Sequence, residues 1–230
     1  MKKLILSMSA LALATAVNAQ EFSSYKPFAG NFTTELGLTG GLFNSEVELP
    51  EGAMLKGRYF LTDNSALRLG LHLSSNTVKE NLWDNKFENK GVYTERASAL
   101  NLNLGYEKHF KGTNRLSPYV GADVLLGFGG EKVQGDNTDG NDYRPNYEFT
   151  GKTSNFTWGV RGVIGADYYF AKNVYLGVEA GWGFVNTIDG KTTIKTTDNG
   201  NTNETEIKSA GSTLGFAPSI VTGIRLGFVL

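Results

Sequence analysis

The chain has 230 residues, of which 40% are hydrophobic and 20% charged, with 29 glycines, 5 prolines and a formal net charge of −1. The near-neutral balance gives no indication of nucleic-acid binding, and the glycine and aromatic content is typical of a chain rich in strands and turns. Cysteine is absent, which excludes disulfides, thiolate metal sites and a lipid anchor on an N-terminal cysteine.

The first nineteen residues have the pattern of a secretory signal peptide. Lys2 and Lys3 form a charged start, residues 4–17 an apolar run, and Val17, Asn18 and Ala19 a small-residue cleavage site. A membrane anchor is the alternative, but the run is short and interrupted by serines. We predict cleavage after Ala19, which leaves residues 20–230 as one domain with 20 basic residues (22 less two lysines) against 23 acidic residues.

The mature chain contains repeated segments in which bulky apolar residues alternate with small or polar residues. This period of two predicts β-strands, and it is most regular around Leu67–Leu73 and Leu100–Tyr106. Eight such segments are predicted, over residues 31–38, 53–61, 66–74, 98–109, 119–128, 156–169, 174–184 and 214–230. No later stretch approaches the ~18 apolar residues of a membrane helix, so a chain that spans a bilayer must do so as a closed barrel.

The connections between these segments alternate in length. Residues 62–65, 111–117 and 170–173 are predicted short turns, whereas residues 39–52, 75–97, 129–155 and 185–213 are predicted long polar loops. Short periplasmic turns and long extracellular loops are typical of bacterial outer-membrane barrels. The predicted fold is therefore an all-β, eight-stranded, antiparallel up-and-down transmembrane β-barrel.

A soluble barrel would also alternate, so the two faces must be assigned separately. The bulky face carries tryptophans and leucines and the other face is rich in glycine, and only the glycine-rich face fits the narrow interior of eight strands. That face also carries charge. We predict a charge network in the lumen made of Glu35, Lys56, Arg58, Arg68, His72, Glu107, Asp123, Arg161, Asp167, Glu179 and Arg225.

Aromatic residues on the bulky face fall near the ends of the predicted strands. Rings of this kind favour the headgroup level of a membrane. We predict an extracellular girdle of Phe128, Phe156, Trp158, Trp182, Phe184 and Phe216, and a periplasmic girdle of Tyr59, Tyr106, Tyr168 and Phe228. A water-surrounded barrel has no physical reason to sort aromatic residues in this way.

In this organisation the chain resembles the small outer-membrane β-barrel family of the OmpX/OmpA type. The most specific motif is the last strand, where Gly223, Leu226 and Phe228 follow the glycine, apolar, aromatic pattern by which that family is inserted. Val221 departs from the usual polar residue, and two residues follow Phe228. The resemblance implies the barrel-insertion machinery as a partner, and we expect no peptidoglycan-binding domain.

The sequence offers little chemistry. His72 with Ser74 and Ser75 could form a lipid-hydrolysing site, but no acid has the right spacing to orient the histidine, so a place in the lumen network is preferred. His109, near a predicted turn, is expected to be interfacial or solvated. The acidic segment 136–142 fails the EF-hand spacing, so no metal, cofactor or catalytic residue is predicted.

The leading prediction is therefore a non-enzymatic barrel with a lumen plugged by side chains. It would serve envelope structure, surface contact through its loops, or a larger complex as an accessory subunit. A narrow transporter for small or hydrophobic molecules is the alternative, and a lipid-modifying enzyme a third. Expected partners are outer-membrane lipid, lipopolysaccharide and other outer-membrane proteins, with no nucleic acid.

Overall fold

The computed structural model describes residues 25–37, 53–208, 211–219 and 225–230, and all its regular elements are strands. The predicted signal peptide therefore lies outside the described residues. Among those residues, no helix has the length and hydropathy needed to cross a membrane. The strands are β1 (Phe32–Gly37), β2 (Ala53–Thr62), β3 (Ser65–Trp83), β4 (Lys90–His109), β5 (Leu116–Thr138), β6 (Tyr143–Ala171), β7 (Val174–Asp198), β8 (Asn201–Lys208), β9 (Ser212–Ser219) and β10 (Arg225–Val229).

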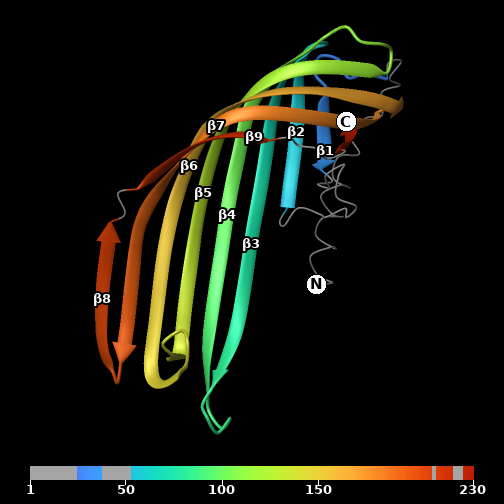
Figure 1. Cartoon of the computed structure of the whole chain (residues 1–230). Helices are drawn as coiled ribbons and strands as arrows, with labels where there is room; N and C mark the ends of the chain where they lie inside the picture. Colours follow the sequence, from blue (N-terminus) through green and yellow to red (C-terminus); the bar gives the residue numbers. More distant parts are fainter. Residues whose placement is uncertain (1–24, 38–52, 209–210, 220–224) are drawn as a thin grey trace.

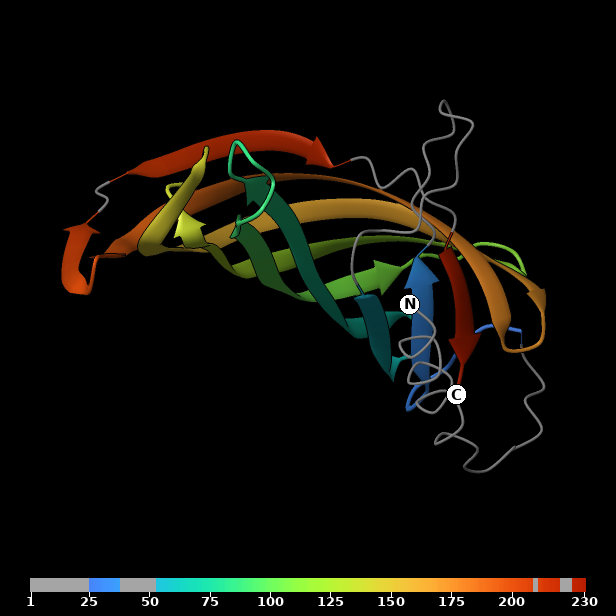
Figure 2. The ribbon, with the colours of Figure 1, turned by 90° about the horizontal axis from the view of Figure 1, so that it is seen from below.

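Eight strands close into a ring. Each of β1 to β7 pairs antiparallel with its neighbour in sequence, and β10 closes the ring by pairing with both β7 and β1. Figure 2 shows β1 and β10 side by side at this seam, where Glu35 lies opposite Gly227. The predicted eighth segment forms two strands, β9 and β10, which both pair with β7. The predicted all-β, antiparallel barrel of eight strands is confirmed.

The longer strands extend well past the ring as hairpins, which the sequence prediction had assigned to loops. Figure 1 shows β3 to β8 running far beyond β1 and β2. Most of residues 75–97, 129–155 and 185–208 is strand, with the turns confined to short stretches such as Asn199–Gly200. Predicted loop 39–52 lies outside the described residues. The other long connections are therefore mostly ordered β-hairpins.

These hairpins form because their residues favour strands although their faces are polar. Segment 187–205 is rich in threonine, which is β-branched. Threonine hydroxyls of adjacent strands lie 3.0 Å apart at Thr197 and Thr202 and 3.1 Å apart at Thr153 and Thr192. Asn199 (φ 49°) and Gly200 (φ 84°) form a two-residue turn with both residues in the left-handed region, as a type I′ hairpin requires.

Within the ring, alternation separates a polar interior from an apolar exterior. The inward side chains include buried Arg58, Glu107 and Asp167, whereas Leu67, Leu104 and Val160 point outward and are about half exposed. At the short-turn end, buried Tyr169, Tyr175 and Val229 pack together, and Tyr25 packs against them. The interior of the ring is thus the core of the protein, and it is built mainly from polar groups.

Candidate functional site

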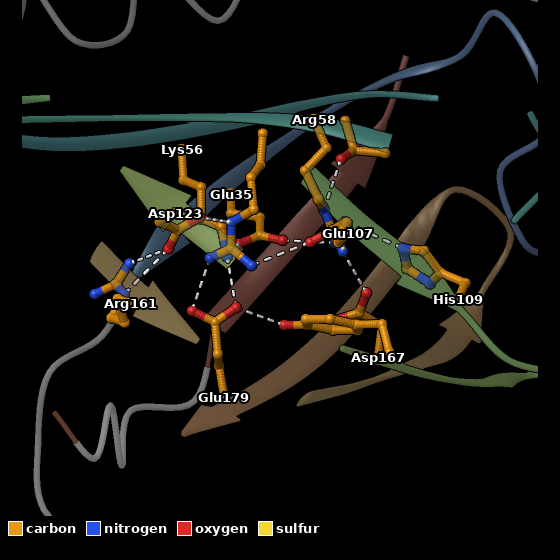
Figure 3. Close-up of polar contacts among 12 residues, drawn as sticks. Glu35, Lys56, Arg58, Glu107, His109, Asp123, Arg161, Asp167 and Glu179 are labelled. Carbon is orange, nitrogen blue, oxygen red and sulfur yellow. Dashed lines mark hydrogen bonds and ion pairs between the residues drawn. The ribbon is translucent and has the colours of Figure 1, made fainter. Parts of the chain in front are cut away.

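The candidate site is a layer of charged side chains that crosses the interior of the ring. It contains five acids and five bases, and every strand of the ring contributes at least one of them. The members are Glu35 on β1, Lys56 and Arg58 on β2, Arg68 on β3, Glu107 on β4, Asp123 on β5, Arg161 and Asp167 on β6, Glu179 on β7 and Arg225 on β10. Figure 3 shows how the labelled members, among them Arg58, Glu107 and Asp167, converge. We call this set of acids and bases the charged layer.

Arg58 lies at the centre of the charged layer and has no exposed surface (0%). Its Nη1 atom pairs with Glu107 Oε1 at 2.9 Å and with Asp167 Oδ2 at 2.7 Å. Its Nη2 atom lies 2.6 Å from Glu35 Oε1 and donates to the Tyr175 hydroxyl at 2.6 Å. One guanidinium therefore binds carboxylates from β1, β4 and β6. These contacts link three strands that are not neighbours in the ring.

Arg68 makes a second junction beside the first. Its Nη1 atom lies 3.2 Å from Glu107 Oε2, its Nη2 atom 2.8 Å from Glu179 Oε1 and its Nε atom 2.9 Å from Asp123 Oδ1. Asp123 in turn accepts from Arg161, whose Nε and Nη2 atoms lie 3.1 and 2.5 Å from Oδ2. The side chain of Arg161 is 14% exposed, so this pair forms the margin of the layer toward the hairpins.

Arg225 and Lys56 complete the layer at the closing seam. Arg225 Nη1 lies 2.8 Å from Glu35 Oε2 and 3.4 Å from Glu179 Oε2. Lys56 Nζ contacts the same two carboxylates at 3.3 and 3.0 Å. The Tyr119 hydroxyl donates to Glu179 Oε2 at 2.7 Å. These contacts join β10 and β1 through side chains as well as backbone.

Removing this many charges from water is costly, and the arrangement offsets the cost by pairing. A buried ion is tolerated when its partners are close and its remaining hydrogen-bonding groups are satisfied. The layer is neutral in sum, with five formal charges of each sign, and its carboxylates each contact at least one cation. The layer therefore behaves as one unit, in which the loss of a member leaves several partners unpaired.

Small residues create the space that the layer occupies. A side chain at Gly105 would overlap the Asp123 carboxylate and lie 2.9 Å from Arg68 Cγ, and one at Gly227 would overlap the Tyr175 ring. These glycines face the lumen, as their alternation with Leu104 and Phe228 requires. Glycine is thus needed where charged and tyrosine side chains cross the narrow interior.

The outer surface of the ring is apolar, with aromatic residues near both ends. Of the ten aromatic residues predicted to form girdles, nine are exposed and Phe156 is half-buried. Near the hairpins, the ring centroids of Phe128 and Phe156 lie 5.2 Å apart and those of Phe184 and Phe216 4.9 Å apart. At the other end, Tyr59 and Tyr106 flank Leu67 on neighbouring strands. The rings of these ten residues thus lie on the outer face of the barrel.

The chain is similar in sequence to a known family of porins. A model of the Putative OmpA-OmpF-like porin family matches residues 51–182, more than half of the chain. The chain belongs to this family. The outer-membrane β-barrel family expected from the sequence is therefore confirmed. No curated protein matches the chain in sequence.

Three solved structures with a similar fold are distant in sequence. The N-terminal β-barrel domain of Pseudomonas aeruginosa OprF is 15% identical, covering 89% of this chain and 100% of that one (TM-score 0.37). A major outer membrane protein from Thermus thermophilus is 13% identical over 88% of this chain and 100% of that one (TM-score 0.48). Acinetobacter baumannii CarO2 is 15% identical over 89% and 100% (TM-score 0.36).

In this porin-family barrel His72 lies apart from the charged layer. It is half-buried on the inner face of β3, and its Nδ1 atom lies 3.4 Å from the Asn101 side-chain nitrogen. Among the described residues, no carboxylate is hydrogen-bonded to His72, so the orienting acid that a His72–Ser74 hydrolytic site would need is not in place there. The other ten predicted members form the layer without it.

The prediction that His109 is interfacial or solvated is wrong, because His109 is buried at the short-turn side of the layer. Its Nε2 atom lies 3.1 Å from Glu107 Oε1 and its Nδ1 atom 2.8 Å from the Ser117 hydroxyl. A carboxylate only accepts hydrogen bonds, so Nε2 carries a proton. The ring packs between Phe60 and Tyr119, with centroids 5.2 Å from each. The end of a predicted strand was mistaken for a solvated turn.

Sequence reasoning also missed the tyrosines of the lumen. Tyr119 and Tyr175 are buried, donate to Glu179 and Glu35, and lie beneath the Arg58 guanidinium at 5.7 and 5.1 Å from ring centroid to Cζ. Alternation along the strand could have found them, because Val120 and Leu176 are apolar, outward residues and their neighbours must point inward. The predicted girdles place aromatic residues on the outer face only.

Beyond the charged layer toward the hairpins lies a cavity of about 860 Å³. Its lining combines small residues with polar ones, and it comprises His72, Ser74, Ser75, Asn76, Ala97, Ser98, Ala99, Gly129, Gly130, Glu131, Thr153 and Asn155 on β3 to β6. Side chains therefore fill the layer itself and leave space above it. Among the described residues, no group of acids and histidines is arranged to hold a metal ion.

Proposed function

We propose that this protein is a non-enzymatic outer-membrane barrel whose lumen is closed by the charged layer and which acts through its outer surface and hairpins. The observation that carries the proposal is the complete burial of Arg58, Glu107 and Asp167 in the middle of the ring, each at 0% exposure. An eight-stranded ring is only just wide enough for side chains. In the lumen, paired charged side chains and two tyrosines therefore occupy the path that a solute would have to take.

The roles left to such a barrel are envelope structure, contact with other surfaces, or service as an accessory subunit of a larger complex. The hairpins support contact, since β3 to β8 continue beyond the ring and carry exposed polar strands. Export through the predicted signal peptide belongs to the same proposal. N-terminal sequencing of the protein from outer membranes tests this step, with Gln20 as the expected first residue.

Conductance measurements test the closed lumen directly. Purified barrel reconstituted into a planar bilayer is expected to give no stable, large conductance, because the charged layer would have to separate before ions could pass. A large-bore porin reconstituted in the same bilayer is the positive control. Stable, large openings of the wild-type barrel, in single insertion events, would contradict the proposal.

A narrow transporter is the second candidate, and the cavity above the charged layer favours it. This space of about 860 Å³ could admit a small solute from the hairpin side, but passage then requires the charged layer to open. Proteoliposomes loaded with small sugars or amino acids discriminate the two candidates. Swelling that depends on the wild-type barrel supports transport, whereas impermeable liposomes support a closed barrel.

The third candidate, a lipid-modifying enzyme, would rely on His72 and the nearby serines. Replacement of His72, Ser74 and Ser75 by alanine followed by an assay of lipid hydrolysis decides the matter for this site. We expect no hydrolysis above background from either protein, because the described part of the chain offers His72 no carboxylate partner. Hydrolysis by the wild type that disappears in the variant would overturn this expectation.

A further inference from the structure

The hairpins beyond the ring sort charge between their two faces. Three pairs of adjacent residues, Lys79–Glu80, Glu95–Arg96 and Glu131–Lys132, each contain one base and one acid. Successive side chains of a strand point to opposite faces. Glu131 lies eight residues beyond the inward Asp123 on β5 and therefore faces inward. This places Lys132 outside, and the antiparallel register carries the same assignment to Arg96. At this height the inner face is thus acidic and the outer face basic, whereas the acids Asp136 and Glu148 lie on the outer face four residues further along their strands.

A second observation supports this sorting of the acids. The pKa of the Tyr93 hydroxyl is raised by partial burial and then by the negative charges of Glu95, Glu131 and Glu80. Tyr93 lies directly opposite Glu80 on β3 and Gly135 on β5. Glu95 lies two residues from Tyr93 on β4 and Glu80 lies opposite Tyr93 on β3, so these two acids share its face, away from Arg96 and Lys132.

On the outer face three cations stand side by side. Arg96 on β4 lies opposite Lys132 on β5, and Lys132 lies opposite Lys152 on β6. Like charges directly opposite on adjacent strands are destabilising. Arg96 donates to the Thr77 hydroxyl at 3.3 Å, but within the described part of the chain no carboxylate lies within ion-pair distance of any of the three. The row holds concentrated positive charge without a protein counterion.

The row lies at a defined height above the apolar surface. Lys132 follows Phe128 by four residues, and Lys152 precedes Phe156 by four, on strands paired without interruption between these positions. Each lysine therefore shares the outer face with the phenylalanine of its own strand and lies about 13 Å from it along the strand. The small residues Ser98, Gly130 and Ser154 separate the two levels. Along the outer face toward the hairpin tips, the surface therefore carries apolar rings, then small residues and then cations. This order matches the acyl chains, the compact linker and the phosphate of a lipid.

We propose that Arg96, Lys132 and Lys152 form a binding site for the phosphate groups of a lipid of the outer leaflet. The aromatic level contacts the acyl chains, and the three cations supply charge-assisted hydrogen bonds to phosphate oxygens. The long lysine stems can lie along the strand surface while their ammonium groups reach the phosphate. The site is independent of the lumen, so it stands whether or not the barrel conducts.

The test uses the whole refolded barrel in uncharged detergent micelles. It is titrated with a diphosphorylated glucosamine-disaccharide lipid, and bound lipid is counted by native mass spectrometry. The triple variant Arg96→Gln, Lys132→Gln and Lys152→Gln is expected to bind about 100-fold more weakly, since each cation at a charged lipid surface contributes about fivefold. The control variant Lys86→Gln, Lys111→Gln and Lys172→Gln removes the same charge elsewhere and is expected to bind like the wild type.

Two further arms identify the source of the phosphate. The same lipid without its phosphates is expected to bind equally weakly to the wild type and the triple variant. Inorganic phosphate is expected not to displace the bound lipid at comparable concentration. Equal affinity of the wild type and the triple variant for the phosphorylated lipid overturns the proposal, and so does displacement by inorganic phosphate alone. Circular dichroism and the gel mobility of unheated samples show that each variant has folded.

Discussion

At the scale of single residues, the charged layer works as a network because few of its members have only one partner. Arg58 contacts three carboxylates, and Glu179 contacts three cations. Pairing in a water-poor interior is favourable only while it is complete, because each orphaned ion then carries its full desolvation cost. The layer is therefore expected to be sensitive to single substitutions, far more than ion pairs on the hairpins.

Replacement of Arg58 by methionine tests this sensitivity. The variant leaves Glu35, Glu107 and Asp167 short of a cation, and we expect the free energy of unfolding to fall by about 3–5 kcal/mol. Urea unfolding of the barrel in lipid vesicles, followed by tryptophan fluorescence, measures the change. Arg144→Met is the matched control, because the Arg144–Asp198 pair is exposed and its loss should cost less than about 1 kcal/mol. Similar losses in both variants would refute the cooperative layer.

The glycines that face the layer provide a second residue-scale prediction. Gly105→Ala forces a Cβ against the Asp123 carboxylate and to 2.5 Å from the Ala122 carbonyl oxygen, so we expect a loss of about 1–3 kcal/mol from overpacking. Gly151→Ala is the control, because nothing lies within 4 Å of its added Cβ. The same unfolding measurement compares the two. A neutral Gly105→Ala would show that the layer is looser than the contacts indicate.

At the scale of elements, the main difference between prediction and structure concerns the long connections. Hydrophobic alternation marks a strand only where one face is wet and the other is not. The hairpins are wet on both faces, so β8 (Asn201–Lys208) is exposed throughout and shows no apolar pattern. The remaining sequence signals for strands in the hairpins were local ones, namely the threonines of β7 and the Asn199–Gly200 turn. Those signals favour hairpins even where periodicity is silent.

The tip of the β3–β4 hairpin has its own pH dependence. The Asp84 carboxylate accepts hydrogen bonds from the Asn89 side chain at 2.9 Å and from the backbone N–H groups of Glu88 and Lys86 at 2.9 and 3.2 Å. The Asn89 bond, followed by the backbone bonds, lowers the pKa of Asp84. A lowered pKa means that this stabilisation of the turn is complete above the unfolded-state pKa and is lost as pH falls through the folded-state value.

Carboxyl ¹³C titration by NMR measures this effect. We expect the Asp84 pKa to lie below the ordinary aspartate value in the wild type and to rise toward it in Asn89→Ala. Asn85→Ala, a neighbouring change that leaves the hydrogen bonds to Asp84 in place, is expected to leave the pKa unchanged. An equal shift in the two variants would mean that the Asn89 side chain is not the main cause.

At the scale of the whole molecule, the orientation of the barrel faces is the property on which a membrane location depends. Trp158 and Trp182 lie on the outer face of the ring and are each 46% exposed, whereas Trp83 ends β3 at a hairpin tip. A bilayer around the ring would place the first two near acyl chains and the third in water. The three tryptophans therefore report on the same membrane at different heights.

Lipids with brominated acyl chains test this arrangement by quenching nearby tryptophans. In single-tryptophan variants, with the other two replaced by phenylalanine, Trp158 and Trp182 are expected to be strongly quenched and Trp83 nearly unaffected. Water-soluble iodide should give the reverse order. Strong iodide quenching of Trp158 and Trp182 in vesicles would show that the apolar face of the ring does not contact lipid.

The sequence alone determined the all-β class and the antiparallel ring of eight strands. It also predicted which charged residues point inward, and the structure brings ten of these together in the charged layer. Those properties depend on local alternation and on side-chain volume, which can be read along one strand. Gly223, part of the predicted insertion motif, lies outside the described residues, whereas Leu226 and Phe228 lie on β10.

Only the tertiary structure decided which charges meet. Arg58 and Asp167 are 109 positions apart and Arg225 and Glu35 190 apart, and alternation cannot say which residues share a height in the ring. That height depends on the register between strands and on their tilt, which are set when the ring closes. For the same reason His109 contacts the charged layer and His72 does not, although both face inward. His109 lies at the level of Glu107, and His72 lies above it beside the cavity.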